Sequence, residues 1–209
     1  MGTEKVIIFG SRDCGDWHFL DTVRGTCSEV ICADGGVKLA RAAGFQPTAY
    51  VGDNVSGGIP PVGIPQVLLP QVKNVTDLEQ ALYYAVQRGG RKILMTGCTG
   101  GRQDHHLANL LLLEQAWQWG AEAEIWDATN RISLLTPGTW EIDCVGYHYF
   151  GLIPLDRQVT GVCIENAKYP LTDYTLHRGS TRSVSNEPLD GFVRITVGSG
   201  NALLIRTKE

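Results

Sequence analysis

Long apolar runs are absent from this sequence, and so is an excess of basic residues. A helix that crosses a membrane needs about 20 consecutive apolar residues, but the longest apolar stretch, residues 107–113, is interrupted by Asn109. The 18 Lys and Arg are outnumbered by 22 Asp and Glu, which gives a net charge of −4. We therefore expect no membrane partner and no binding to nucleic acid through a basic surface.

Cysteine pairs of the C-x-x-C type are also absent. The six cysteines show no metal-like spacing to a histidine, which favours reduced, structural thiols over a zinc site. The first apolar run, residues 6–10, is too short for the core of a signal peptide. The expected location is the cytoplasm.

The composition that remains is that of an ordinary folded protein. Of the 209 residues, 43% are hydrophobic and 19% are charged, which excludes disordered, collagen-like and coiled-coil classes. The length fits one large domain or two small ones.

The first part of the chain, up to about Asp127, alternates short apolar runs with helical patterns. This alternation predicts a mostly parallel sheet covered by helices on both faces. The clearest helix follows Thr76, because residues 76–79 have the form of a capping box. In a second helix, which opens near Asp104, four apolar residues are expected to face the sheet: Leu107, Leu110, Leu111 and Trp117.

The second part of the chain loses the helical periodicity. Seven short apolar runs separated by turn residues follow Asp127, a pattern typical of a β-sandwich. We therefore predict an α/β plus all-β protein, with a Rossmann-like α/β domain over residues 1–127 and a carboxy-terminal β-sandwich over residues 128–209.

Polar residues cluster at four places in the predicted α/β domain, after strands or at helix starts. The four clusters are residues 34–36, 52–56, 73–77 and 97–105. Open parallel sheets bind ligands beyond the carboxyl ends of their strands, and helix N-termini attract phosphate. Asp53 and Asp77 offer the hard oxygen ligands that Mg²⁺ prefers, and Arg102 can contact phosphate through two N–H groups. The glycine-rich cluster at residues 97–105 matches neither the P-loop nor the dinucleotide-binding pattern. Together these residues indicate a site for a nucleotide and Mg²⁺.

Each of these residues also has a purely structural interpretation. Asp34 and Asp53 are common types of turn residue at strand ends, and Asp77 lies within the capping box, where an acid stabilises the helix. Arg102 and His105, taken singly, are typical solvated surface residues. The gathering of all four clusters at the ends of one predicted sheet favours the functional interpretation.

In these clusters the sequence resembles the thiamine pyrophosphokinase family. The resemblance covers nearly the whole chain and implies an α/β domain that binds the nucleotide, a β-sandwich that binds thiamine, and a homodimer. The matching segments are A-D-G-G at 33–36, G-D-x-x-S at 52–56, K-x-x-T-D at 73–77, G-G-R-x-D-H at 100–105, K-Y-P-L at 168–171 and S-x-S-N-E at 183–187.

The resemblance implies Mg²⁺-dependent transfer of a pyrophosphoryl group from ATP to the hydroxyl of thiamine, which yields thiamine diphosphate and AMP. It assigns the metal ion to Asp53 and Asp77. Catalysis would involve the same two acids together with Arg102 and with Asp104, which orients the substrates or helps with the hydroxyl proton. The implied nucleotide-binding residues are Asp34, Gly35, Gly36, Lys73, Thr76, Gly100, Gly101 and His105, and the implied thiamine-binding residues are Ser183, Ser185 and Asn186.

Two acids of the family pattern are missing, because Val55 and Asn74 occupy their positions. Asn74 keeps a carbonyl oxygen, whereas Val55 offers no ligand atom. Fewer carboxylates weaken the attraction of a hard cation, although ATP brings phosphate oxygens of its own. Three hypotheses therefore stay open: an active enzyme with a reduced metal site, a catalytically impaired protein that binds thiamine or nucleotide, and a diphosphokinase for another alcohol.

Overall fold

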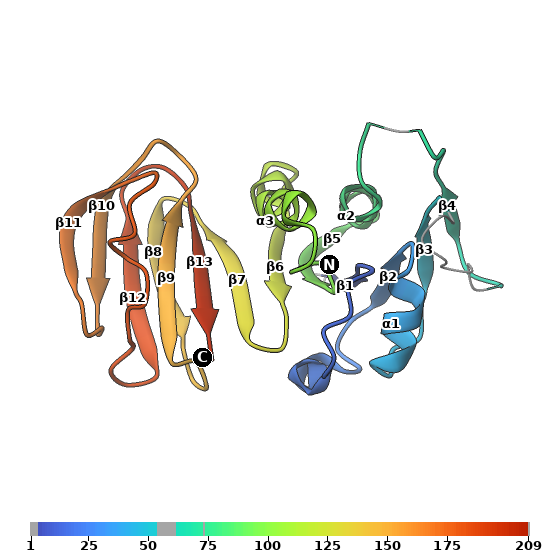
Figure 1. Ribbon diagram of the computed structural model, residues 1–209, viewed down its shortest axis with the longest axis horizontal. Coiled ribbons are helices and arrows are strands. Elements are labelled where there is room, and N and C mark those ends of the chain that lie inside the picture. Colours follow the sequence, from blue (N-terminus) through green and yellow to red (C-terminus); the bar gives the residue numbers. More distant parts are fainter. Residues whose placement is uncertain (1–3, 54–61, 73, 209) are drawn as a thin grey trace. The chain divides into compact units, whose positions relative to one another are not determined.

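The computed structural model describes residues 4–53, 62–72 and 74–208. The chain forms two compact units, Met1–Ala128 and Thr129–Glu209 (Figure 1). Val55 and Lys73 lie outside the described residues. No helix in the described ranges combines the length and apolar character of a membrane span, and each of the six cysteines is a free thiol.

The amino-terminal unit contains a parallel sheet with the strand order β4-β3-β2-β1-β5-β6. All neighbouring pairs in this order run parallel, which confirms the predicted sheet type. The carboxyl ends of the strands therefore share one edge of the sheet, where the polar clusters were expected. The strands are β1 (Glu4–Phe9), β2 (Glu29–Ala33), β3 (Ala49–Gly52), β4 (Gln66–Leu68), β5 (Gly90–Thr96) and β6 (Glu122–Trp126).

Helices cover both faces of this sheet. Helix α1 (Gly36–Ala42) lies on one face together with the short 3-10 helix η1 (His18–Val23), and α2 (Asp77–Gln87) and α3 (Gln103–Gln118) lie on the other (Figure 1). Each helix follows a parallel strand and runs back along the sheet, so its N-terminus lies at the carboxyl edge. Burial on both faces explains why residues 6–9 of β1 form a continuous apolar run rather than an alternating one.

Helix α2 begins as the capping box predicted. Thr76 Oγ1 accepts a hydrogen bond of 3.2 Å from the backbone N–H of Glu79, which satisfies one of the free donors of the first turn. The buried residues of this helix follow the expected apolar stripe, and they are Leu78, Ala81, Leu82, Ala85 and Val86.

The expected orientation of α3 is wrong for three of its four apolar residues. Leu107, Leu111 and Trp117 are 60%, 53% and 50% exposed, and Leu110 alone of the four is buried. The reason is Asn109, whose buried Nδ2 donates a hydrogen bond of 2.8 Å to the carbonyl oxygen of Cys98. This hydrogen bond fixes the rotation of the helix about its axis. The four consecutive leucines at residues 110–113 do not by themselves determine which face of the helix is buried.

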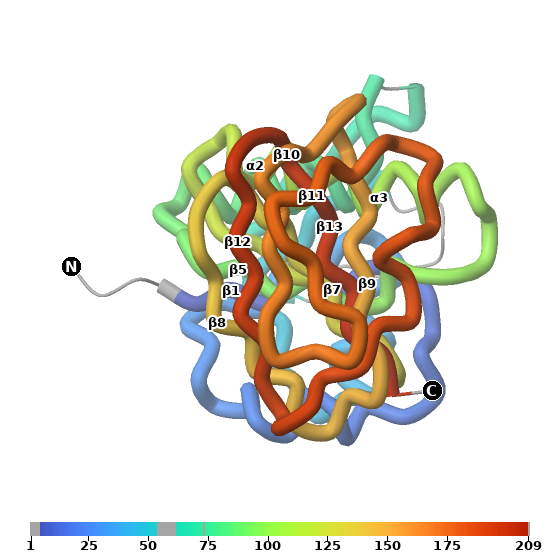
Figure 2. Tube along the Cα trace, turned by 90° about the vertical axis from the view of Figure 1, so that its left-hand side faces the viewer, coloured from blue at the N-terminus to red at the C-terminus, as the bar shows by residue number. Residues whose placement is uncertain are grey.

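The carboxy-terminal unit is an antiparallel β-structure with two sheets, as predicted. Its chain can be followed from yellow to red in Figure 2. One group of strands has the order β7-β13-β9, and the second sheet has the order β11-β10-β12-β8. The strands are β7 (Asn130–Leu135), β8 (Gly138–Asp143), β9 (Tyr149–Pro154), β10 (Gln158–Glu165), β11 (Leu171–His177), β12 (Phe192–Val197) and β13 (Ala202–Thr207).

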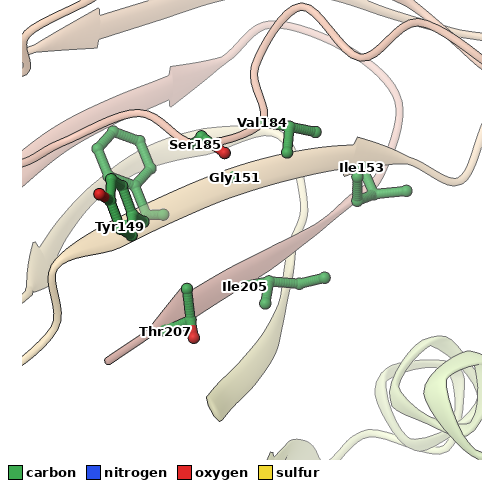
Figure 3. A pocket seen from close by; sticks show the side chains of 8 residues that line it. Tyr149, Gly151, Ile153, Val184, Ser185, Ile205 and Thr207 are labelled. Carbon is green, nitrogen blue, oxygen red and sulfur yellow. The ribbon is translucent and has the colours of Figure 1, made fainter. Parts of the chain in front are cut away.

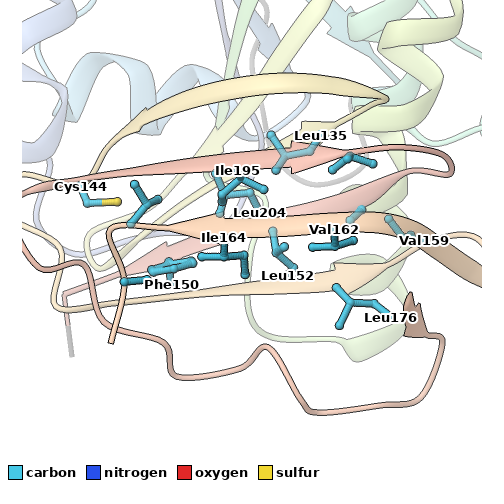
Figure 4. Packing of buried hydrophobic residues seen from close by; sticks show 14 residues of the cluster. Leu135, Cys144, Phe150, Leu152, Val159, Val162, Ile164, Leu176, Ile195 and Leu204 are labelled. Atoms are coloured by element: carbon cyan, nitrogen blue, oxygen red, sulfur yellow. The ribbon is translucent and has the colours of Figure 1, made fainter. Parts of the chain in front are cut away.

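The core of this unit is formed by alternate residues of its strands (Figure 4). On β9, Phe150 and Leu152 are buried in this core together with Val162 and Ile164 of β10. Because successive side chains of a strand point to opposite faces, the residues between them on β9 face away from this core. That outer face carries the cavity described below.

Candidate metal and phosphate site

Three aspartates from different elements meet at the carboxyl edge of the parallel sheet. Asp34 follows β2, Asp53 follows β3, and Asp77 is the first residue of α2. One carboxylate oxygen from each lies within 4.8 Å of the other two. We call these three residues the carboxylate cluster. Parallel strands and the helix that starts at the same edge bring them together, as the sequence predicted for Asp53 and Asp77.

Asp34 is buried, unlike an ordinary turn residue at the surface. It is 3% exposed, and its φ of 45° is in the left-handed region, which aspartate and asparagine adopt more readily than other residues with a Cβ. Tyr50 Oη donates a hydrogen bond of 3.1 Å to Asp34 Oδ1. Burial of a carboxylate is unfavourable unless it gains partners, so this arrangement favours a functional role for Asp34 over a turn-forming one.

Two glycines allow the backbone to pack closely around the cluster. A Cβ on Gly52 would lie 2.7 Å from Tyr50 Oη and 3.0 Å from the Cα of Asp34. A Cβ on Gly36 would lie 2.1 Å from the carbonyl oxygen of Phe9. Gly36 is thus required for the packing of α1 against β1, whatever it contributes to a nucleotide. Gly35, next to it, is the N-cap residue of α1.

The donor set of the carboxylate cluster suits a hard divalent cation. Octahedral Mg²⁺ holds oxygen ligands at about 2.1 Å, so neighbouring ligand oxygens lie roughly 3 to 4 Å apart. The three oxygens, all within 4.8 Å of one another, reach this spacing with small side-chain rotations or with bridging waters. Asn74, where the resemblance implies an acid, is exposed.

The glycine-rich loop after β5 leads into α3 and carries an exposed ion pair. Arg102 Nη2 lies 2.5 Å from Asp104 Oδ2, and their side chains are 71% and 63% exposed. Asp104 also accepts a hydrogen bond from the backbone N–H of His105. The hydrogen bond from Arg102 lowers the pKa of Asp104 below its ordinary value, and the same bond raises the pKa of Arg102. Asp104 is therefore a carboxylate, not a proton donor, at neutral pH.

Two contacts in this region were not anticipated from the sequence. His106 Nδ1 accepts a hydrogen bond of 3.0 Å from the backbone N–H of Gly100, so this amide is engaged within the loop. The neighbouring His105, which the family resemblance assigns to the nucleotide, is exposed. Arg12, in the loop after β1, lies against Gly101. Its position two residues after the apolar run at residues 6–10 was the signal that could have identified it.

In the carboxy-terminal unit, two of the three residues assigned to thiamine are buried and bonded to backbone. Ser183 Oγ donates to the carbonyl oxygen of Leu152 at 2.7 Å. Asn186 Nδ2 donates to the carbonyl oxygen of Tyr169 at 2.8 Å, and Asn186 Oδ1 accepts from the N–H of the same residue at 3.0 Å. These bonds hold the segment around Ser185, which is exposed and has a φ of 57°.

Ser185 lines a cavity of about 340 Å³ (Figure 3). The size is that of a site for a small organic molecule. The lining is mostly apolar, and three side-chain hydroxyls, those of Tyr149, Ser185 and Thr207, are the polar groups among it. The lining residues are Tyr149, Phe150, Gly151, Ile153, Val184, Ser185, Ile205 and Thr207.

Comparison with known proteins gives a consistent result for both units. Residues 21–125 match the family described as "Thiamin pyrophosphokinase, catalytic domain", and residues 141–201 match "Thiamin pyrophosphokinase, vitamin B1 binding domain". A curated relative, thiamine pyrophosphokinase of Bacillus subtilis (strain 168), is 30% identical over 138 residues. This match spans 66% of the chain and 64% of the relative's length.

Solved structures of similar proteins cover almost the entire chain. The crystal structure of thiamine pyrophosphokinase from Bacillus subtilis is 25% identical with a TM-score of 0.88, and covers 99% of this chain and 100% of its own. The crystal structure of thiamin pyrophosphokinase from Geobacillus thermodenitrificans is 28% identical with a TM-score of 0.86, and covers 98% of both chains.

Proposed function

Because the chain belongs to the thiamin pyrophosphokinase family, we propose that it transfers a pyrophosphoryl group from ATP to the hydroxyl of thiamine. The products are thiamine diphosphate and AMP. The observation that carries this proposal is the meeting of Asp34, Asp53 and Asp77 at the carboxyl edge of the sheet, within the unit that matches the catalytic domain.

The carboxylate cluster would hold Mg²⁺ in this proposal. The ion, when bound, supplies positive charge to the transferred phosphates and fixes their orientation. The hydrogen bond from Tyr50 holds the Asp34 carboxylate in place, which is the usual function of a residue behind a metal ligand. Asp34, which the resemblance assigned to the nucleotide, thus joins Asp53 and Asp77 as a candidate ligand.

The remaining residues at this edge act by positioning and by charge. In the reaction a bond forms between the thiamine hydroxyl oxygen and the β-phosphorus of ATP, and the hydroxyl proton passes to a base. The bond from that phosphorus to the oxygen that bridges it to the α-phosphorus breaks, and AMP leaves with this oxygen. Little covalent chemistry falls to the protein in such a transfer. We assign Arg102 to the phosphates and Asp104, as a carboxylate, to orienting the substrates or accepting the hydroxyl proton. Lys73 keeps its expected phosphate contact as a proposal, since it lies outside the described residues.

The cavity beside Ser185 is the proposed site for thiamine. Its apolar walls suit a heterocyclic ring, and its few hydroxyls can orient one. The bonded side chains of Ser183 and Asn186 shape this wall rather than turn toward a ligand. The homodimer and the cytoplasmic location also remain proposals, and they rest on the family alone.

A direct test is AMP formation from ATP with and without thiamine at millimolar Mg²⁺. The wild type is expected to form AMP only when thiamine is present. Asp53→Asn and Asp77→Asn are expected to lose at least about 100-fold in kcat, because each removes one charge of the metal site. Glu122→Gln is a matched control, since it removes a charge from an exposed side chain at the opposite, amino end of β6. Full activity in both aspartate variants would contradict the metal assignment.

One observation favours a second candidate function, a protein that binds nucleotide or thiamine without turnover. Asn74 replaces a family acid and is exposed. Because an asparagine side chain is neutral, it adds no charge to the carboxylate cluster. Binding of ATP and thiamine with no AMP formation at millimolar Mg²⁺ would favour this candidate. AMP formation with another primary alcohol, but not with thiamine, would instead indicate a diphosphokinase of different acceptor specificity.

A further inference from the structure

The loop after β1 is bonded to the loop after β5. The backbone N–H of Gly10 donates to the carbonyl oxygen of Thr96, and that of Arg12 donates to the carbonyl oxygen of Gly97, both at 2.8 Å. The two loops are therefore one connected backbone surface at the carboxyl edge of the sheet.

The guanidinium of Arg12 lies directly on the glycine-rich loop. A Cβ placed on Gly101 would meet Arg12 Nη2 at 2.0 Å and Cζ at 2.3 Å. Arg12 is exposed, and no residue in the described ranges gives its side chain a hydrogen bond or an ion pair. Arg102, by contrast, is already paired with Asp104. The guanidinium N–H groups of Arg12 are thus available to bind a ligand at the carboxyl edge of the sheet.

The strand order places Arg12 between the two halves of the proposed site. Strand β1 lies between β2, which leads to Asp34, and β5, which leads to the glycine-rich loop. The chain leaves β1 toward β2 and later returns to β5, so a topological switch point lies at β1 and β5, where open sheets bind ligands. Neighbouring strands are about 4.8 Å apart, so the ends of β2 and β5 are about 10 Å apart. An extended polyphosphate can bridge this distance.

We propose that Arg12 binds the polyphosphate of the nucleotide between the carboxylate cluster and the glycine-rich loop. This assignment rests on the proposed function. A guanidinium presents two parallel N–H donors that match two phosphate oxygens. The three carboxylates on the other side of β1 would repel the same phosphates unless positive charge is supplied, and Arg12 supplies a permanent part of it.

The test compares Arg12→Gln and Arg12→Lys with the wild type. The probe is an ATP analogue with a methylene group between the α- and β-phosphorus, titrated in the presence of Mg²⁺. A charge-assisted hydrogen bond is worth roughly 1.5 to 3 kcal/mol, so we expect Arg12→Gln to raise the Kd of the analogue by about 10- to 100-fold. Arg12→Lys should have an intermediate Kd, because a lysine keeps the charge but not the two-donor geometry.

Steady-state kinetics separate nucleotide binding from a general structural effect. Arg12→Gln should raise the KM for ATP and leave the KM for thiamine within about twofold of the wild type. Arg41→Gln is the matched control, because Arg41 is an exposed arginine in the last turn of α1, at the opposite end of the sheet. It is expected to change neither KM. Both arginines are exposed, so both variants should fold.

Two different failures can be distinguished. If Arg12→Gln binds the analogue and uses ATP as the wild type does, the assignment of Arg12 is wrong and the proposed function stands. If the wild type neither binds the analogue nor forms AMP, the proposed function is wrong, and the assignment falls with it.

Discussion

Tyr50 Oη donates a hydrogen bond of 3.1 Å to Asp34 Oδ1, and both side chains are buried. Tyr50 lies on β3 and Asp34 directly after β2, and these strands are paired neighbours in the sheet. The bond therefore connects the scaffold to the carboxylate cluster. It fixes one of three acids whose relative position determines whether they can share an ion.

Removal of this donor should weaken the metal site and leave the fold intact. We expect Tyr50→Phe to raise the Mg²⁺ concentration for half-maximal AMP formation by about 10-fold or more, as is typical of residues behind a metal ligand. The cost in unfolding free energy should be about 1 to 3 kcal/mol, because the accepting carboxylate stays buried. Tyr174→Phe is the control, since it removes the hydroxyl of an exposed tyrosine in the other unit. An unchanged Mg²⁺ dependence would refute the link between Tyr50 and the metal.

The charge of Asp34 should destabilise the protein when no cation is present. Three carboxylates within 4.8 Å repel one another, and asparagine tolerates the left-handed backbone at this position. We therefore expect Asp34→Asn to raise the Tm in a chelating buffer by about 2 to 4 °C, which corresponds to about 1 kcal/mol for a chain of this size. Mg²⁺ should raise the Tm of the wild type more than that of the variant. A lower Tm for Asp34→Asn in chelator would contradict this account.

The carboxylate cluster could be predicted because it depends on topology. Asp34, Asp53 and Asp77 each follow a strand or begin a helix in a sequence whose alternation indicates a parallel sheet, and the carboxyl ends of such strands share one edge. The burial of Asp34 and its bond to Tyr50 could not be predicted in the same way. They depend on the packing of β3 against β2, and Tyr50 stands in an apolar run where it looks like one more core residue.

The exposed face of α3 shows the same limit. Hydrophobic periodicity cannot orient a helix that is apolar on several sides, and here Asn109, by its bond to Cys98, decides which leucines are buried. Arg12 was missed for a related reason. Its contact with Gly101 links two loops that are far apart in sequence and adjacent only because β1 and β5 pair.

The pH dependence of Asp104 follows from its bond to Arg102. That bond lowers the pKa of Asp104 below the ordinary value of 3.8, so its favourable interaction is present above that value and is lost as the pH falls through the lowered pKa. Arg102→Gln should raise the pKa of Asp104 back toward 3.8, which NMR titration of the carboxyl carbon can measure. High salt should have the same effect in the wild type, because both groups are exposed. A pKa that Arg102→Gln leaves unchanged would show that the pair does not persist in solution.

Gly100 and Gly101 form a matched pair that separates backbone strain from the role of Arg12. Their φ values are 74° and 68°, so alanine at either position costs roughly 1 to 2 kcal/mol of folding free energy. The two alanine variants should therefore show similar decreases in Tm. Alanine at Gly100 meets nothing within 4 Å, whereas alanine at Gly101 displaces the guanidinium of Arg12. We expect Gly101→Ala to raise the Kd of the methylene ATP analogue about 10-fold more than Gly100→Ala does, since only the first moves a phosphate ligand. In an Arg12→Gln background this difference should vanish, and its persistence there would mean that the loop itself, not Arg12, is responsible.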